Sequence, residues 1–165
     1  MGFVAAYTNT YIDPPKHVVV EPNPDLHPVL ESVSEKNDCG FELVPAAYSS
    51  DSNDVRLSLG RTPVSSQTSV RGGGITTEGV SLQCLTDGLD EFCLICDVEG
   101  SERDLLANEI EVIRRNCRAI VVEFQPEQLD DETGKTRASL ERSFDTVEGR
   151  EKDVYVFKKG DSPEG

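Results

Sequence analysis

The sequence predicts an α/β fold in which a mainly parallel, doubly wound sheet alternates with helices. Two segments, Val18–Pro24 and Leu94–Gly100, are apolar runs that each stop at a carboxylate and a turn. The order strand, helix, strand, insertion, strand, helix, strand along the chain is typical of such a sheet. Ligands of open α/β sheets bind at the carboxyl ends of the strands. Glu21 and Asp97 are therefore the first candidates for a functional site.

The first part of the chain contains two expected helices and two expected strands. A helix over residues 3–12 is expected to end at the prolines that follow Asp13, because a residue before proline avoids the helical conformation. Asn23 is an expected N-cap, followed by Pro24 at the first helical position. That helix is expected to end at residues 38–40, and strands are expected over residues 18–21 and 41–47.

The rest of the chain alternates again after an irregular insertion. Alternating polar and apolar residues predict short strands at Val55–Leu59 and Val80–Cys84. Ser101 and Asp104 form an expected capping box for a helix that carries Leu105, Leu106, Ile110 and Ile113. Further strands are expected at 92–96, where the run reads as buried, at 118–124 and at 154–157, with a weaker helix near 136–145.

Composition indicates one domain over residues 1–160 with a flexible tail at 161–165. The net charge of −15, with 31 acidic against 16 basic residues, argues against nucleic-acid binding, which needs a basic face. An acidic surface of this kind resembles that of proteins adapted to strong salt, where carboxylates keep the chain hydrated. No apolar run is long enough to span a bilayer and no secretory signal is recognisable, so a cytoplasmic location is expected.

The five cysteines are expected to be structural thiols in a reducing compartment. Cys93, Cys96 and Cys117 lie in apolar stretches, which predicts that they are buried. The Cys93-to-Cys96 spacing resembles half of a redox or zinc site, but it lies inside an expected strand, and no second pair or histidine cluster completes a metal site. His17 and His27 are interpreted as surface residues.

The spacing before Glu21 resembles that of a nucleotide-binding unit. Such units open with a strand and a glycine-rich turn, and an acidic residue for the ribose hydroxyls follows about 20 residues later. Gly2 precedes Glu21 by 19 residues. This places the glycine turn at the first residues and predicts that the opening strand and most of the glycine loop are missing.

Four segments in order resemble the FkbM-type methyltransferases: Glu21–Pro24, Val44–Ser49, Cys96–Glu102 and Val121–Pro126. The Asp97-Val98-Glu99-Gly100 element is the most specific of them. The resemblance implies a class I methyltransferase fold, S-adenosylmethionine as cofactor, and O-methylation of a hydroxyl on a sugar or a small natural product.

The resemblance also implies roles for particular residues. Gly2, Glu21, Asn23 and Ala46 would bind the cofactor, with Glu21 accepting hydrogen bonds from its ribose hydroxyls. Asp97 or Glu99 would take the proton of a hydroxyl acceptor. Glu123 is a third strand-end acid that either touches the substrate or closes a turn.

Two alternatives remain open at this point. The chain is either an active enzyme or an inactive, truncated remnant that serves as an interaction module. A dinucleotide-binding oxidoreductase would also place an acid at Glu21, but the chain shows no second nucleotide-binding half.

Overall fold

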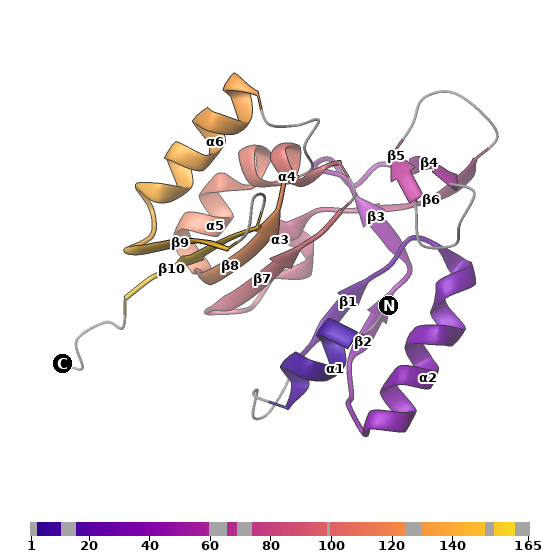
Figure 1. The fold of residues 1–165 in the computed structure, drawn as a ribbon. Helices are drawn as coiled ribbons and strands as arrows, with labels where there is room; N and C mark the ends of the chain where they lie inside the picture. The colour runs from indigo at the N-terminus through magenta and orange to yellow at the C-terminus, as the bar shows by residue number, and fades with distance from the viewer. Residues whose placement is uncertain are drawn as a thin grey trace. The chain divides into compact units, whose positions relative to one another are not determined.

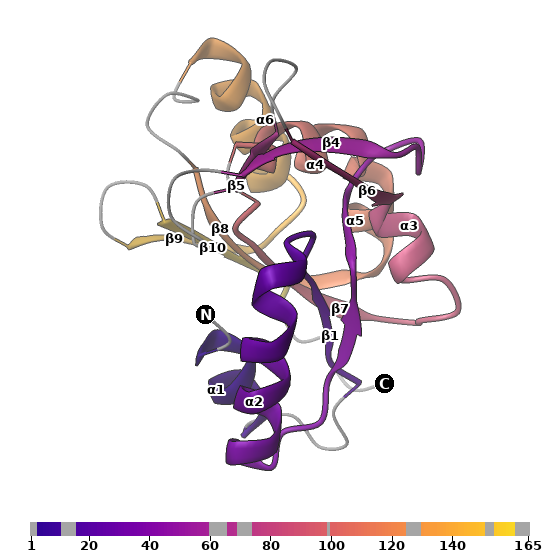
Figure 2. The ribbon, with the colours of Figure 1, turned by 90° about the vertical axis from the view of Figure 1, so that its right-hand side faces the viewer.

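The computed structural model describes residues 3–10, 16–59, 66–68, 74–98, 100–124, 130–150 and 154–160. The chain divides into two compact units, residues 1–80 and residues 81–165, and each is described by itself (Figures 1 and 2). Gly2, Glu99 and the expected tail at 161–165 lie outside the described residues. None of the described helices is long and apolar enough to cross a membrane.

The described residues of the first unit form two small sheets, two α-helices and a short 3-10 turn. Its elements in chain order are α1 (Phe3–Asn9), β1 (Val18–Val20), the 3-10 turn η1 (Pro24–Leu26), α2 (His27–Asn37), β2 (Glu42–Val44), β3 (Ala46–Tyr48), β4 (Val55–Leu59), β5 (Ser66–Thr68) and β6 (Ile75–Val80). Strands β1 and β2 pair in parallel, while a second sheet has the order β3-β6-β4-β5. Helices α1 and α2 lie side by side (Figure 2).

The boundaries of α2 follow from local chemistry, as the sequence predicted. The Asn23 side chain accepts a hydrogen bond from the backbone N–H of Asp25 and opens η1, which continues directly into α2. Asp38 ends α2 in the left-handed conformation with φ of 50°. Leu26 in η1 and Leu30 in α2 are the buried side chains of this segment.

The second unit is a four-stranded sheet with helices. It contains α3 (Leu82–Leu85), β7 (Phe92–Cys96), α4 (Glu102–Asn108), α5 (Ile110–Asn116), β8 (Cys117–Glu123), α6 (Asp131–Glu141), β9 (Thr146–Arg150) and β10 (Val154–Lys158). The strand order is β7-β8-β10-β9, with β7 and β8 parallel and β10 antiparallel to both neighbours. Helix α4 packs against α5 and α6 (Figure 1). The largest fully buried apolar side chains here are Leu106, Ile113, Ile120, Val122, Phe124, Leu140 and Phe157.

The strand arrangement differs from the expected single, mainly parallel sheet. The described strands divide among three sheets, and Pro45 separates β2 from β3 within the expected strand 41–47. Proline lacks the N–H that would continue the ladder. Strand β9, which the sequence analysis missed, pairs antiparallel with β10. Because β10 is also antiparallel to β8, the last part of the sheet is not parallel. The mixed α/β class is confirmed.

Four helices also differ from expectation, and a polar residue that the sequence analysis did not recognise marks each difference. Ser81 caps a short helix, α3, where a strand was expected, by accepting from the N–H of Cys84. The expected helix after Ser101 breaks into α4 and α5 at Glu109. Asp130 caps α6, which therefore begins five residues before the expected position.

Several side chains are more exposed or more buried than the sequence predicted. Successive side chains of β7 point to opposite faces of the sheet, and those on one face are open: Cys93 is exposed and Ile95 retains 45% of its accessible surface. Cys96 and Cys117 are buried, as predicted. His17 and His27 are half-buried instead of being surface residues. Burial beside Phe41 lowers the pKa of His17.

Gly79 provides a stability test of the first unit. A Cβ at this position would lie 1.8 Å from the carbonyl oxygen of Asn53 and 2.7 Å from the Cβ of Ser49. Because backbone has to shift to relieve such contacts, we expect Gly79→Ala to lower the free energy of unfolding by about 2–3 kcal/mol or more. The matched control is Gly40→Ala, whose Cβ would meet nothing within 4 Å. Equal urea midpoints for the two variants would contradict this packing.

Candidate functional site

Glu21 lies at the carboxyl end of β1, at the same sheet edge as the segment that follows β2. Its backbone N–H donates to the carbonyl oxygen of Val44 over 3.1 Å, which continues the β1–β2 ladder by one residue. Because β1 and β2 are parallel, Pro45 and Ala46 leave β2 at this edge. The structure therefore brings Glu21 and Ala46, two of the sequence-predicted cofactor residues, to the same edge.

The Glu21 carboxylate is half-buried, and one of its two oxygens accepts a hydrogen bond from the described part of the chain. Its Oε1 accepts a hydrogen bond of 2.8 Å from the backbone N–H of Asn23. Among the described residues, no hydrogen bond is made to Oε2. Burial raises the pKa of Glu21, although the Asn23 N–H and the nearby His27 ring act in the opposite direction. A desolvated carboxylate with a spare oxygen is a strong acceptor for a hydroxyl donor.

Neighbouring polar groups fix the turn that follows Glu21. Asn23 is buried, and its Oδ1 is engaged with the Asp25 N–H. His27 Nε2 donates to the Glu21 carbonyl oxygen over 2.8 Å. These contacts hold the backbone on both sides of the carboxylate. Sequence reasoning assigned Asn23 to cofactor binding and did not recognise this positioning contact of His27.

Asp97 occupies the corresponding place in the second unit. It is exposed and directly follows β7, one residue beyond the paired residues Cys96 and Val122. Because β7 and β8 are parallel, Glu123 at the end of β8 lies at the same edge. Asp97 and Glu123 are both open to solvent, so neither carboxylate is covered by the described part of the chain.

Glu102 is a loop-positioning residue that sequence reasoning did not single out. Its side chain is fully buried, and its Oε1 accepts from the backbone N–H of Val98 at 3.0 Å and of Gly100 at 3.2 Å. The Gly100 N–H also lies 3.0 Å from Oε2. Gly100 has φ of 107°, a conformation that favours glycine. One carboxylate thereby holds both sides of the loop that follows Asp97.

This contact replaces the expected capping box. The Ser101 side chain does not cap α4. Glu102, in the first turn of α4, instead accepts from the Val98 and Gly100 amides that precede the helix, and an acid in this turn is favoured by the positive end of the helix dipole. The sequence did contain a signal for this contact: Glu102 is an acid at the first position of the helix, two residues after Gly100.

The Cys93–Cys96 spacing does not form a redox pair. Residues three apart in a strand point to opposite faces, and here Cys93 is exposed while Cys96 is buried. Burial raises the pKa of Cys96, and the nearby carboxylates of Glu102 and Asp97 raise it further. Burial likewise raises the pKa of Cys117 to about 12. Both buried thiols therefore stay protonated and unreactive, in agreement with the structural interpretation.

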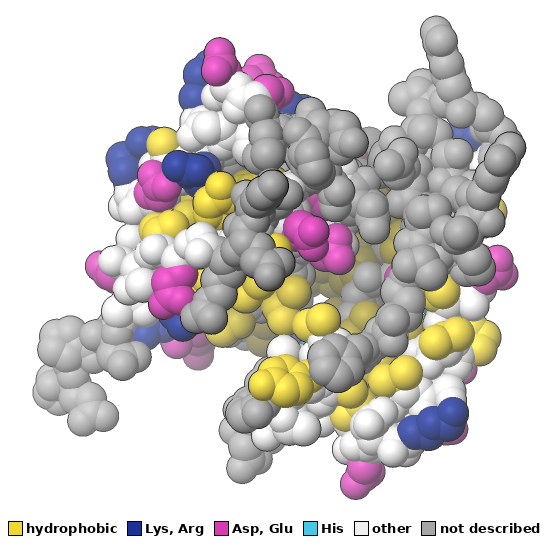
Figure 3. Space-filling model, in the orientation of Figure 1, with side chains coloured by type: hydrophobic (Ala, Val, Ile, Leu, Met, Phe, Trp, Pro, Cys, Tyr) yellow, Lys and Arg dark blue, Asp and Glu magenta, His cyan; other side chains and the backbone are white. Residues whose placement is uncertain are grey.

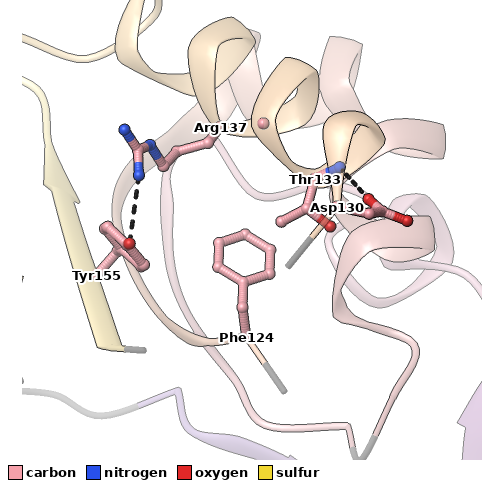
Figure 4. Close-up of a pocket in the computed structure, with 6 residues that line it drawn as sticks. Phe124, Asp130, Thr133, Arg137 and Tyr155 are labelled. Atoms are coloured by element: carbon pink, nitrogen blue, oxygen red, sulfur yellow. Dashed lines mark hydrogen bonds between the residues drawn. The ribbon is translucent and has the colours of Figure 1, made fainter. Parts of the chain in front are cut away.

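A small pocket lies next to the carboxyl end of β8 (Figure 4). Phe124, the first residue after β8, lines it together with Tyr155 of β10 and four residues at the start of α6: Asp130, Thr133, Gly134 and Arg137. Its volume is about 200 Å³. The pocket and Asp97 thus belong to the same edge of the second unit.

Glu102→Gln tests the loop contact. The substitution leaves a single acceptor oxygen and turns an amide NH₂ toward backbone N–H groups, so we expect a loss of about 2 kcal/mol in the free energy of unfolding. Hydrogen exchange at the Val98 and Gly100 amides should become at least about tenfold faster.

Glu109→Gln is the matched control for this test. Glu109 is also buried and accepts from a backbone N–H, that of Leu82 at 3.0 Å. Its substitution should speed exchange at Leu82 and leave Val98 and Gly100 unchanged. Unaltered protection of the loop amides in Glu102→Gln would show that the carboxylate does not hold the loop.

Comparison with known proteins assigns the family. The model of the methyltransferase FkbM domain matches residues 2–152. No curated protein and no solved structure gives a significant match. The family match runs through both units and includes Glu21, Asp97 and Glu102. The chain therefore belongs to the FkbM methyltransferase family.

Proposed function

We propose that this protein is an S-adenosylmethionine-dependent methyltransferase that methylates a hydroxyl of a sugar or small natural product. The observation that carries the cofactor assignment is the half-buried Glu21 carboxylate at the carboxyl end of β1. One of its oxygens is held by the Asn23 N–H, while the other has no hydrogen-bond donor among the described residues. The ribose hydroxyls of the cofactor are donors of the kind that this oxygen lacks.

The family match supports treating the two units as one methyltransferase domain over residues 1–160, with the Rossmann-like sheet of class I enzymes. The match crosses the boundary between the units. Within each unit, the parallel pair β1–β2 or β7–β8 brings candidate residues to its carboxyl edge. Gly2, Asn23 and Ala46 complete the proposed cofactor residues. The five cysteines, all present as thiols, fit a reducing compartment such as the cytoplasm.

Proton removal is assigned to the loop that follows β7. When bound, S-adenosylmethionine would supply a methyl group on a positively charged sulfonium: the acceptor oxygen would attack the methyl carbon in line, the C–S bond would break, and S-adenosylhomocysteine would leave. Alignment supplies most of the catalysis in such a displacement. Asp97, or Glu99 in the same loop, would accept the proton of the acceptor hydroxyl. Glu102 would hold this loop through the Val98 and Gly100 amides.

Glu21→Ala tests the cofactor site. We expect it to weaken S-adenosylmethionine binding by about 1.5–3 kcal/mol, the range for hydrogen bonds to a charged group. Isothermal titration calorimetry measures the affinity. In the unchanged protein, affinity should also fall as the pH drops through the raised pKa of Glu21, since the protonated acid is the weaker acceptor. Glu21→Gln should lack this pH dependence, and an unchanged affinity in Glu21→Ala would remove the residue from the site.

Asp97→Asn and Glu99→Gln test the assignment of the base. The variant that removes the base should slow methyl transfer by about 10²–10⁴-fold, with little change in cofactor affinity, because the amide keeps the shape and loses the proton-accepting charge. Transfer of a tritiated methyl group to a panel of monosaccharides and phenols gives the rate. Glu35→Gln, an exposed acid on α2, is the control, and Glu123→Gln tests the neighbouring strand-end acid in parallel. Full activity in both loop variants would leave transfer to alignment alone or to another acid.

A further inference from the structure

Glu21 uses almost all of its hydrogen-bonding groups within the protein. Its backbone N–H donates to the carbonyl oxygen of Val44 over 3.1 Å, and its Oε1 accepts from the Asn23 N–H over 2.8 Å. Its carbonyl oxygen accepts from His27 Nε2 over 2.8 Å. Oε2 has no such contact among the described residues. The direction in which Oε2 points therefore depends on these three contacts.

The contact from His27 differs from the other two because a side chain makes it. The Val44 and Asn23 contacts use backbone groups of those residues, which almost any residue would supply. A carbonyl oxygen can only accept, so Nε2 of His27 carries the proton in this contact. His27 is half-buried, and histidine side chains show almost no surface on the face drawn in Figure 3. The residue type at position 27 therefore decides whether the Glu21 carbonyl oxygen is held.

Helix α2 does not itself require a histidine at this position. Asn23 caps the start of the helical segment, since its Oδ1 accepts from the Asp25 N–H. The backbone N–H of His27 already donates to the carbonyl oxygen of Pro24. Histidine is a middling helix former, and the helix dipole favours cations at the carboxyl end of a helix, not at its start. The contact with Glu21 accounts for the imidazole better than the helix does.

The imidazole ring also acts on the charge of Glu21. Burial raises the pKa of this carboxyl, while the Asn23 N–H and the nearby His27 ring lower it. An ionised carboxylate accepts hydrogen bonds more strongly than a neutral acid. One side chain thereby favours both the position and the ionised form of the acceptor.

We propose that His27 is a positioning residue for cofactor binding: by holding the Glu21 carbonyl oxygen, it directs Oε2 toward the ribose hydroxyls. This inference rests on the proposed function. His27 does not have to touch the cofactor, because its Nε2 is already engaged within the protein. Its effect on affinity therefore passes through Glu21, which separates it from a residue that only stabilises the fold.

His27→Gln and His27→Asn form a matched pair that tests this contact. The amide nitrogen of glutamine lies as far along its side chain as Nε2 does in histidine, whereas that of asparagine lies one atom shorter. We expect His27→Asn to weaken S-adenosylmethionine binding about three- to tenfold, the equivalent of one lost hydrogen bond. His27→Gln should keep an affinity close to that of the unchanged protein. Calorimetric titration of the whole chain measures both.

His17→Ala is the control for loss of a histidine. His17 is also half-buried, directly precedes β1 and packs edge to face on Phe41. Its removal should lower Tm and leave the affinity unchanged. An affinity that falls as much in His17→Ala as in His27→Asn would reduce the effect to stability and overturn the proposal.

A double-mutant cycle shows whether His27 acts through Glu21. In the Glu21→Ala background, His27→Asn should change the affinity by less than about twofold, because the group that it positions is gone. The same loss in both backgrounds, equal losses in the Gln and Asn variants, or no loss in His27→Asn would each overturn the proposal.

A measurement without cofactor separates this inference from the proposed function. Hydrogen exchange at the Asn23 amide, which donates to Glu21 Oε1, should become at least about threefold faster in His27→Asn and stay unchanged in His27→Gln. Unaltered exchange in His27→Asn would contradict the positioning role. Exchange that responds as expected, in a protein that binds no adenosyl compound, would refute the proposed function and leave His27 as the residue that positions Glu21.

Discussion

Parallel strand pairing is the constraint on which the functional interpretation depends. Strands β1 and β2 run in the same direction, as do β7 and β8. Their carboxyl ends must therefore share an edge, and the residues that follow them must emerge together. In the first unit, Glu21 therefore lies at the edge from which the chain continues beyond β2 to Ala46. In the second unit, Asp97 lies at the edge where Phe124 follows β8 and lines the pocket. An antiparallel pairing of either pair would send these residues to opposite ends of the sheet.

The two carboxylates Glu21 and Glu102 differ in how far the protein satisfies them. A buried charge is tolerated only when hydrogen bonds replace the water that it has lost. Glu102 is fully buried and has the Val98 and Gly100 amides on its two oxygens, so its role is completed inside the protein. Glu21 is half-buried with one oxygen engaged, and its pKa is raised by burial. This contrast is the physical basis for assigning one carboxylate to positioning and the other to ligand binding.

The elements that the sequence predicted well were those fixed by local rules. The cap at Asn23, the end of α2 at Asp38 and the strands at β7, β8 and β10 follow from side-chain chemistry or apolar runs within a few residues. The errors came from partners far away in the sequence. Helices α4 and α5 break at Glu109, whose carboxylate is engaged with the Leu82 N–H, and Ile95 points to the open face of β7 although it lies in an apolar run. The loop contact of Glu102 and the pocket next to β8 were missed for the same reason. The residues that form them come together only in the folded chain.

Calorimetric titration of the chain with S-adenosylmethionine, S-adenosylhomocysteine and NAD tests the central claim most directly. A methyltransferase site that holds the cofactor through ribose hydroxyls and Glu21 should bind the first two ligands in competition with each other, because they share the same nucleoside. NAD carries the same adenosine but bears a pyrophosphate where the other two carry an amino-acid side chain on sulfur, so it should bind much more weakly than either of them. Binding of NAD with equal or greater affinity, or no binding of either adenosyl compound, would contradict the proposal.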